Sequence, residues 1–163
     1  MRPDPIIARI LTKLRDCMCE YLSDPATSPL SGPPCSCCIV WSETPYQDGC
    51  DCSCTDGSTG RAYIRYVNTR GIVGPQSRCP NGLAVTIELG IVRCYDISVE
   101  TPSCEILEGE AMGALADMYA LRRIVSCCAA LPRNRWTMDE ALPIGPSGGC
   151  YGSTITVTFQ TPW

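Results

Sequence analysis

The sequence predicts an α+β domain in which two helices cover one face of a mostly antiparallel, four-stranded sheet. Three observations lead to this prediction: two amphipathic helical patterns, strand-like alternation between them, and one alternating segment after the second helix. The expected element order is therefore helix, three strands, helix, strand (α-β-β-β-α-β). Such alternation is typical of an antiparallel sheet with one solvated face, and two helices are enough to cover the other face as a two-layer sandwich.

The first helix is predicted to begin at Asp4 and to end by residues 23–25. An aspartate is a favourable N-cap, and Pro5 suits the first helical position. Apolar residues recur at spacings of three and four, which predicts one buried face. These residues are Ile7, Ile10, Leu14, Cys17, Met18 and Tyr21. The Pro- and Ser-rich segment 23–34 is expected to be a loop.

Three strands are predicted at residues 37–42, 61–67 and 83–98, with a loop at 68–82 before the third. The third strand would be about 50 Å long, against a usual strand length of roughly 17–20 Å. Either Gly90 bends or bulges this strand, or part of it projects beyond the domain. A projecting strand is an exposed edge, which proteins tolerate mainly when another chain pairs with it.

The second helix is predicted over residues 108–131, stopped by Pro132. Its expected apolar face consists of Ala111, Ala114, Leu115, Met118, Leu121, Val125 and Cys128. The glycine-rich tract 145–152 that follows a Trp- and Pro-rich loop is weakly similar to a phosphate loop. It lacks the lysine, and a strand follows it instead of a helix. We interpret it as a turn that positions the final strand, residues 153–160.

The chain has 14 cysteines and no histidine, and six of the cysteines lie in a Cys-rich loop at residues 35–60. They are Cys35, Cys37, Cys38, Cys50, Cys52 and Cys54. Four thiolates could hold a tetrahedral zinc ion, although the C-x-C spacing is tighter than usual. The alternatives are one or more disulfides, or free thiols in a loop. The sequence leaves the metal content unknown.

Composition argues against several classes of function. A chain of 163 residues is expected to form one domain, 1–163, with a formal charge of −4 that disfavours a nucleic-acid binder. Without histidine there is no Ser-His-Asp or Cys-His catalytic machinery, so we expect no enzyme, no catalytic residues and no cofactor. No run approaches a membrane span, and no signal peptide is evident, so a cytosolic site of synthesis is expected.

The charged residues show no pairing in the sequence. Asp117, Asp139 and Glu140 are therefore expected to be solvated on helix or loop surfaces. The pair Arg122-Arg123 is expected to lie on a solvated helix face, with contact to an acidic partner as the alternative. Trp41, Trp136 and Trp163 are expected to be packing residues, with Trp163 docking on a neighbouring molecule.

Several segments together resemble the neck proteins of long-tailed bacteriophages of actinobacteria. The resemblance covers residues 35–160, and the first helix fits by position only. The segments are Asp48-Gly49-Cys50, Gly60–Arg65, the strand end Gly90–Cys94, a helix with Asp117-Met118, Arg122-Arg123 and Cys127-Cys128, then Trp136, Gly145–Cys150 and the Thr-rich final strand. Cysteines 17, 19, 52, 54, 79 and 104 fall outside this pattern. Within the neck, the order of elements is most similar to the tail-terminator family.

This resemblance implies a structural virion protein of the head-tail connector. A tail terminator forms a hexameric ring that ends tail-tube polymerisation and joins the tail to the head. The implied partners are other copies of the chain, the tail-tube protein below and a head-tail stopper or connector above, with no membrane and no specific nucleic-acid binding as the genome passes through the ring. The implied location is the neck of the virion, assembled in the host cytoplasm.

Two alternatives to a terminator remain at this point. The first is another neck component, such as the head-tail stopper or a connector subunit. The second, from a different class, is a zinc- or disulfide-stapled binding module. For a ring subunit, we expect the strand 83–98, or the preceding loop 68–82, to contact the adjacent subunit.

Overall fold

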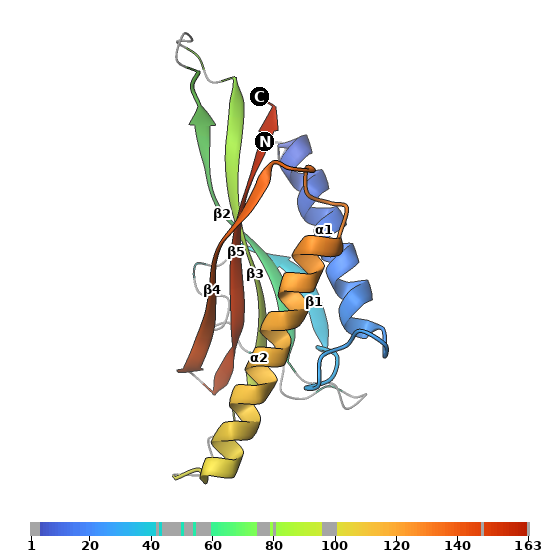
Figure 1. The fold of residues 1–163 in the computed structure, drawn as a ribbon, viewed down its shortest axis with the longest axis vertical. Coiled ribbons are helices and arrows are strands. Elements are labelled where there is room, and N and C mark those ends of the chain that lie inside the picture. The colour runs from blue at the N-terminus through green and yellow to red at the C-terminus, as the bar shows by residue number, and fades with distance from the viewer. Residues whose placement is uncertain are drawn as a thin grey trace.

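Two helices pack on one face of a single five-stranded sheet (Figure 1). The computed structural model describes residues 4–41, 43, 50, 54, 60–74, 79, 81–95, 101–147 and 149–162. Its elements are α1 (Pro5–Ser23), β1 (Ser36–Val40), β2 (Arg61–Ile72), β3 (Gly82–Cys94), α2 (Cys104–Cys127), β4 (Trp136–Ser147) and β5 (Cys150–Pro162). The α+β prediction is confirmed, whereas the predicted four strands and the predicted element order are wrong.

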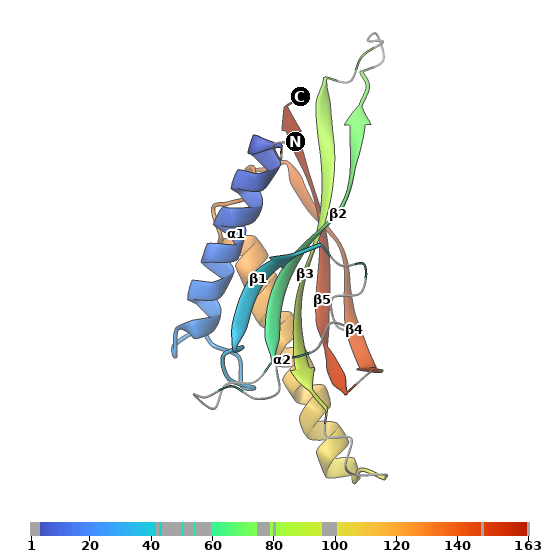
Figure 2. The same ribbon diagram turned by 180° about the vertical axis from the view of Figure 1, so that it is seen from behind.

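The sheet has the strand order β1-β2-β3-β5-β4. β1 pairs with β2 in parallel, and the other three pairings are antiparallel, so the sheet is mixed. The view from behind shows that neither α1 nor α2 covers the second face of the sheet (Figure 2). The central strand β3 pairs along its whole length with β5, from Gly82 opposite Pro162 to Cys94 opposite Cys150.

The strand that the sequence did not predict is β4, which forms a hairpin with β5. Residues 136–147 contain Pro143, Gly145 and Pro146, which disfavour strands. They are tolerated because β4 is an edge strand that pairs on one side only, and because its register shifts near Asp139 and again between Ile144 and Ser147. The final strand starts at Cys150, three residues before the predicted start.

β3 is shorter than predicted, and Gly90 does not bulge it. The register with both neighbouring strands is unbroken through Gly90, and the irregularity lies in β2, between Tyr66 and Asn68. Gly90 is needed for a different reason, because a Cβ atom there would lie 2.3 Å from Cζ of Tyr63. Residues 96–98 of the predicted strand lie outside the described residues.

The alternative expectation, a projecting end, agrees with the arrangement in Figure 1. The β2–β3 hairpin extends past α1 at one end of the molecule, and the N-terminal turns of α2 extend past the sheet at the opposite end. Residues 68–72 and 82 belong to strands of this hairpin, so the loop predicted at 68–82 is wrong at those positions. We call the two extremities the hairpin end and the helix end.

The main core lies between the helices and the covered sheet face. The strands contribute Ala62, Ile64, Val85, Ile87, Leu89, Ile91, Ile155, Val157 and Phe159, and the helices contribute Leu11, Leu14, Met18, Leu22, Ala120, Leu121, Ile124 and Val125. Full burial of one such large side chain stabilises the fold by about 1.5–3 kcal/mol. The N-cap of α1 is as predicted, because the Asp4 carboxylate accepts hydrogen bonds from the backbone N–H groups of Ile6 and Ile7.

The predicted buried face of the second helix is partly wrong. α2 begins at Cys104, with Ser103 as its N-cap, and ends at Cys127. Its buried side includes Gly113 and Asp117, whereas Leu115 is 58% exposed. The buried face of α2 therefore differs from the face that the apolar pattern predicts, because Gly113 and Asp117 occupy positions that face the sheet.

Candidate functional site

Disulfides join the helices, the strands and the Cys-rich loop. Four are formed within the described part of the chain: Cys17–Cys128, Cys19–Cys37, Cys35–Cys54 and Cys50–Cys150. Their Cα atoms are 5.8–6.1 Å apart, as disulfide geometry requires. Cys94 is disulfide-bonded as well. Of the three alternatives for the Cys-rich loop, namely zinc, disulfides and free thiols, Cys35, Cys37, Cys50 and Cys54 therefore follow the second.

The Cys-rich loop does not gather its thiols around one point. Cys35 pairs with Cys54 inside the loop, but Cys37 pairs with helix α1 and Cys50 pairs with the start of β5. Among the described residues, no group of three or more cysteine, aspartate or glutamate side chains is placed to hold a metal ion. Cys52, also a candidate zinc ligand, lies outside the described residues.

A small second core lies on the uncovered sheet face. It consists of Cys50, Tyr63, Val92 and Cys150, with Cys38, Val40, Cys94 and Ile144 packed around it. Gly149 in the β4–β5 turn has a positive φ of 79°, and its carbonyl accepts a hydrogen bond from the backbone N–H of Tyr95. This geometry agrees with a turn that positions the last strand. Gly148 lies outside the described residues.

The most unusual charged pair of the described chain is Arg93 with Asp117, both almost completely buried. The guanidinium donates to both carboxylate oxygens, from Nε to Oδ2 at 2.9 Å and from Nη2 to Oδ1 at 2.8 Å. Nη2 also donates to the carbonyl of Gly32 at 2.9 Å. The expectation of a solvated Asp117 is therefore wrong, because β3 places an arginine opposite it.

Burial decides the electrostatics of this pair. Desolvation raises the pKa of Asp117 above its usual 3.8, and the hydrogen bonds and positive charge of Arg93 offset only part of that effect. Burial also raises the pKa of the neighbouring Tyr151, helped by the negative charge of Asp117. Because the guanidinium already bonds a carboxylate and a backbone carbonyl, the pair fastens α2 and the loop at Gly32 to the sheet.

Glycine and serine let α2 approach the sheet closely at this pair. A Cβ atom at Gly113 would lie 2.8 Å from Oγ of Ser31, and Ser153 donates a hydrogen bond to the carbonyl of Ala114 at 2.7 Å. At Gly152, a Cβ atom would lie 2.0 Å from the carbonyl oxygen of Ile91, so only glycine fits there. The sequence contains one signal of this buried pair. Arg93 continues the alternate positions of β3 that face the core.

The other charged candidates lie at the surface, as expected. Asp139 and Glu140 are exposed on β4, where Asp139 accepts hydrogen bonds from the hydroxyls of Thr137 and Thr158. Arg122 and Arg123 are exposed on α2, and a hydrogen bond with Tyr21 raises the pKa of Arg123. None of these four residues lies in a shared catalytic arrangement with another within the described chain.

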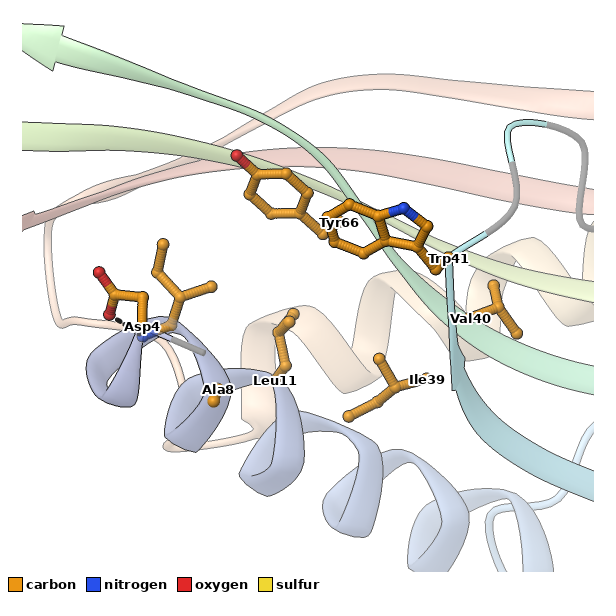
Figure 3. Close-up of a pocket in the computed structure, with 8 residues that line it drawn as sticks. Asp4, Ala8, Leu11, Ile39, Val40, Trp41 and Tyr66 are labelled. Carbon is orange, nitrogen blue, oxygen red and sulfur yellow. Dashed lines mark hydrogen bonds between the residues drawn. The ribbon is translucent and has the colours of Figure 1, made fainter. Parts of the chain in front are cut away.

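An apolar groove runs between α1 and the β1 edge of the sheet (Figure 3). Its volume is about 340 Å³, and its lining includes Ile7, Leu11 and Ile39. Trp41 stacks on Tyr66 at its rim, with ring centroids 5.5 Å apart and planes 5° apart. Trp41 is 84% exposed, so it packs on one side only. Trp136 is half-buried against the core, and Trp163 lies outside the described residues.

The largest group of exposed apolar side chains on one element lies on α2. It consists of Ile106, Leu107, Met112, Leu115 and Tyr119, of which we call Met112, Leu115 and Tyr119 the α2 stripe. Met112, Leu115 and Tyr119 are spaced by three and four residues, so they lie on one side of the helix. Contiguous exposed apolar surface of this kind marks interaction sites.

No protein-family model matches the chain, and no curated protein matches its sequence. Neither helix of the described chain combines the length and the apolar character that crossing a membrane requires.

Proposed function

We propose that the chain is a structural subunit of the head-tail connector of a long-tailed bacteriophage. In this proposal it is a tail terminator, which forms a ring, ends tail-tube polymerisation and joins the tail to the head. The observation that supports it best is the combination of a disulfide-stapled body with two protrusions at opposite ends, the β2–β3 hairpin and the N-terminal turns of α2. Protrusions of this kind reach neighbouring subunits in an assembly.

The chemistry of the described residues also favours a structural role. The buried Arg93 and Asp117 bond each other, so this pair has a fastening function. Five exposed apolar residues lie along α2, where a partner can cover them. Obligate interfaces in such assemblies bury on the order of 2,000 Å² or more and are more apolar than transient ones.

The edges of the sheet are poor sites for adding another strand. The edge strand β4 has two prolines, register shifts and exposed carboxylates at Asp139 and Glu140, all of which discourage edge pairing. The edge strand β1 has five residues and is fastened to α1 by Cys19–Cys37. We therefore place the contacts between subunits on the protrusions and on α2.

A second function is favoured by the disulfides themselves. Disulfides persist in oxidising surroundings, where small secreted domains use them as staples. A disulfide-stapled binding module would use the apolar groove beside Trp41 as its ligand site. In the connector proposal, the same bonds form after assembly in the host cytoplasm, once the particle is released.

Electron microscopy of the purified protein separates these functions. A connector subunit is expected to form closed rings with a central hole of tail-tube width. The binding module is expected to remain a monomer at every concentration and to retain its disulfides. A ring would support the connector class as a whole. It would not distinguish a tail terminator from a head-tail stopper or another connector subunit.

A further inference from the structure

We infer that a hollow between α1 and the segment after α2 binds an extended peptide segment of a partner protein, in which acidic and apolar side chains alternate. The hollow has a volume of about 590 Å³, which is within the usual range for a ligand site. We call it the basic hollow, because two exposed basic residues join the apolar residues of its lining. They are Arg9 and Lys13, beside Ile6, Ile10, Ala129 and Leu131. The inference does not depend on the proposed function, since the partner is not another copy of this chain.

A disulfide fastens the two walls of the basic hollow to each other. One wall is the N-terminal half of α1, and the other is the segment 129–132, which runs beside it after α2 ends (Figure 1). Cys17 of α1 is bonded to Cys128, the residue immediately before the second wall. Leu131 is buried in the main core and anchors the other end of that wall. A site whose walls are held in place beforehand loses less conformational freedom when it binds a ligand.

The basic hollow is positive on a chain whose formal charge is −4. Arg9 and Lys13 are exposed, and neither forms an ion pair with a residue that the structure describes. The carboxylates nearest to them in the sequence already have partners, because Asp4 caps α1 and Asp16 pairs with Arg15. The two cations are therefore available to an anionic ligand.

The segment that follows the second wall adds two more cations. The backbone N–H of Arg135 donates to the carbonyl of Pro132 at 3.2 Å, which closes a turn directly after the hollow. Arg133 and Arg135 are both exposed on this turn. Positive charge therefore lies on both walls. A ligand with several negative charges is favoured here and a cationic one is disfavoured, because like charges placed together are costly.

The spacing of the basic residues matches an extended peptide. Arg9 and Lys13 are four residues apart on a helix, so they lie about 6 Å apart along its axis. Alternate side chains of an extended peptide are about 6.6 Å apart and point to the same side. Two acidic side chains at alternate positions can therefore meet both cations, while the residues between them face the apolar lining. A fatty-acid carboxylate has a single charge and leaves one of the cations unpaired.

A synthetic peptide tests this match. The probe is an acetylated and amidated hexapeptide of alternating glutamate and leucine, titrated into the full chain and followed by calorimetry. We expect saturable binding at one site, weakened by high salt because the charges are exposed. A hexapeptide of three glutamates followed by three leucines has the same composition and is expected to bind about tenfold more weakly. An alternating peptide of lysine and leucine is expected not to bind.

Charge removal locates the binding site. The double variant Arg9→Gln with Lys13→Gln is expected to weaken binding of the alternating probe about tenfold, because it removes both cations of the hollow. The matched control is Arg122→Gln with Arg123→Gln, which removes the same charge from an exposed pair on α2. This control is expected to bind the probe as the unchanged protein does.

Filling the hollow gives an independent test. Ala129 is an exposed residue of the lining, so Ala129→Phe places a large side chain where the peptide would lie and is expected to abolish binding. Ala111→Phe makes the same change at an exposed position of α2 outside the hollow and is expected to leave binding unchanged. Thermal unfolding of each variant verifies that it is folded.

The outcomes separate this inference from the proposed function. No saturable binding of the alternating probe to the folded protein overturns the inference, and so does equal binding of the block peptide or of Arg9→Gln with Lys13→Gln. Binding of decanoate without binding of the probe also overturns it, in favour of a small anionic amphiphile. Rings that form without probe binding contradict only this inference, whereas probe binding without rings contradicts only the connector function.

Discussion

Replacing Arg93 with methionine is expected to lower the free energy of unfolding by about 3–5 kcal/mol at neutral pH. The variant leaves the Asp117 carboxylate, which is completely buried, without its cation and without two hydrogen bonds. It also removes the hydrogen bond to the carbonyl of Gly32. Chemical denaturation measures the loss, and Arg15→Met is the control, because Arg15 pairs with Asp16 at the surface and that change is expected to cost less than about 1 kcal/mol.

The variant to compare with Arg93→Met is the double replacement of Arg93→Met with Asp117→Leu. Removing both charges leaves no unpaired ion, and an apolar pair of similar volume is often as stable as a buried ion pair. The double variant is therefore expected to recover most of the loss. A double variant as unstable as Arg93→Met would mean that the loss comes from packing, not from the unpaired carboxylate.

The pH dependence of the same variant has a definite sign. Burial raises the pKa of Asp117 above 3.8, so the folded protein binds this proton more tightly than the unfolded chain does. The carboxyl therefore favours folding most below pH 3.8, and that contribution falls as pH rises through the folded-state pKa. Without Arg93 the pKa rises further, so the deficit of Arg93→Met is expected to shrink at acidic pH. A deficit independent of pH would contradict this explanation.

Removing the disulfide between Cys17 and Cys128 by alanine replacement is expected to lower the free energy of unfolding by about 4–5 kcal/mol. The two cysteines are 111 residues apart, so the bond restricts the unfolded chain more than a short loop would. It also holds α1 to the end of α2. Denaturation of the oxidised protein and of the variant gives the difference, and peptide mapping under non-reducing conditions verifies the pairing.

The matched control is the bond between Cys19 and Cys37, which are 18 residues apart. Its removal is expected to cost less, about 3 kcal/mol, because the closed loop is shorter. An equal loss for both bonds would argue against restriction of the unfolded chain as the main cause. A fully reduced protein as stable as the oxidised one would show that neither bond contributes.

Much of the fold follows from local patterns, and the failures have physical causes. The Asp4-Pro5 start and apolar spacing identify α1, and alternation identifies β2, β3 and β5, because these strands each bury one face. β4 is missed because an edge strand tolerates prolines and bulges that a central strand does not. Its two prolines and glycine are typical of a loop in any reading based on residue preferences alone.

The candidate surfaces depend on long-range pairing that a sequence pattern does not contain. Disulfide connectivity cannot be deduced from cysteine spacing, and here bonds join positions 111 and 100 residues apart. Asp117 is polar in sequence and buried in the fold because Arg93 lies opposite it. Asp117 occupies a core-facing position of α2 that an apolar residue usually holds. The apolar pattern therefore predicts a buried face that includes Leu115, which is exposed in the fold.

The growth of tail tubes tests the proposed function most directly. Purified tail-tube protein from the same genome is polymerised with and without this chain, and tube lengths and ends are recorded by electron microscopy. The account predicts a ring of this chain on one end of each tube and arrested growth at that end. Tubes that grow to the same lengths with bare ends, in the presence of folded protein, would contradict the assignment of this chain as a tail terminator.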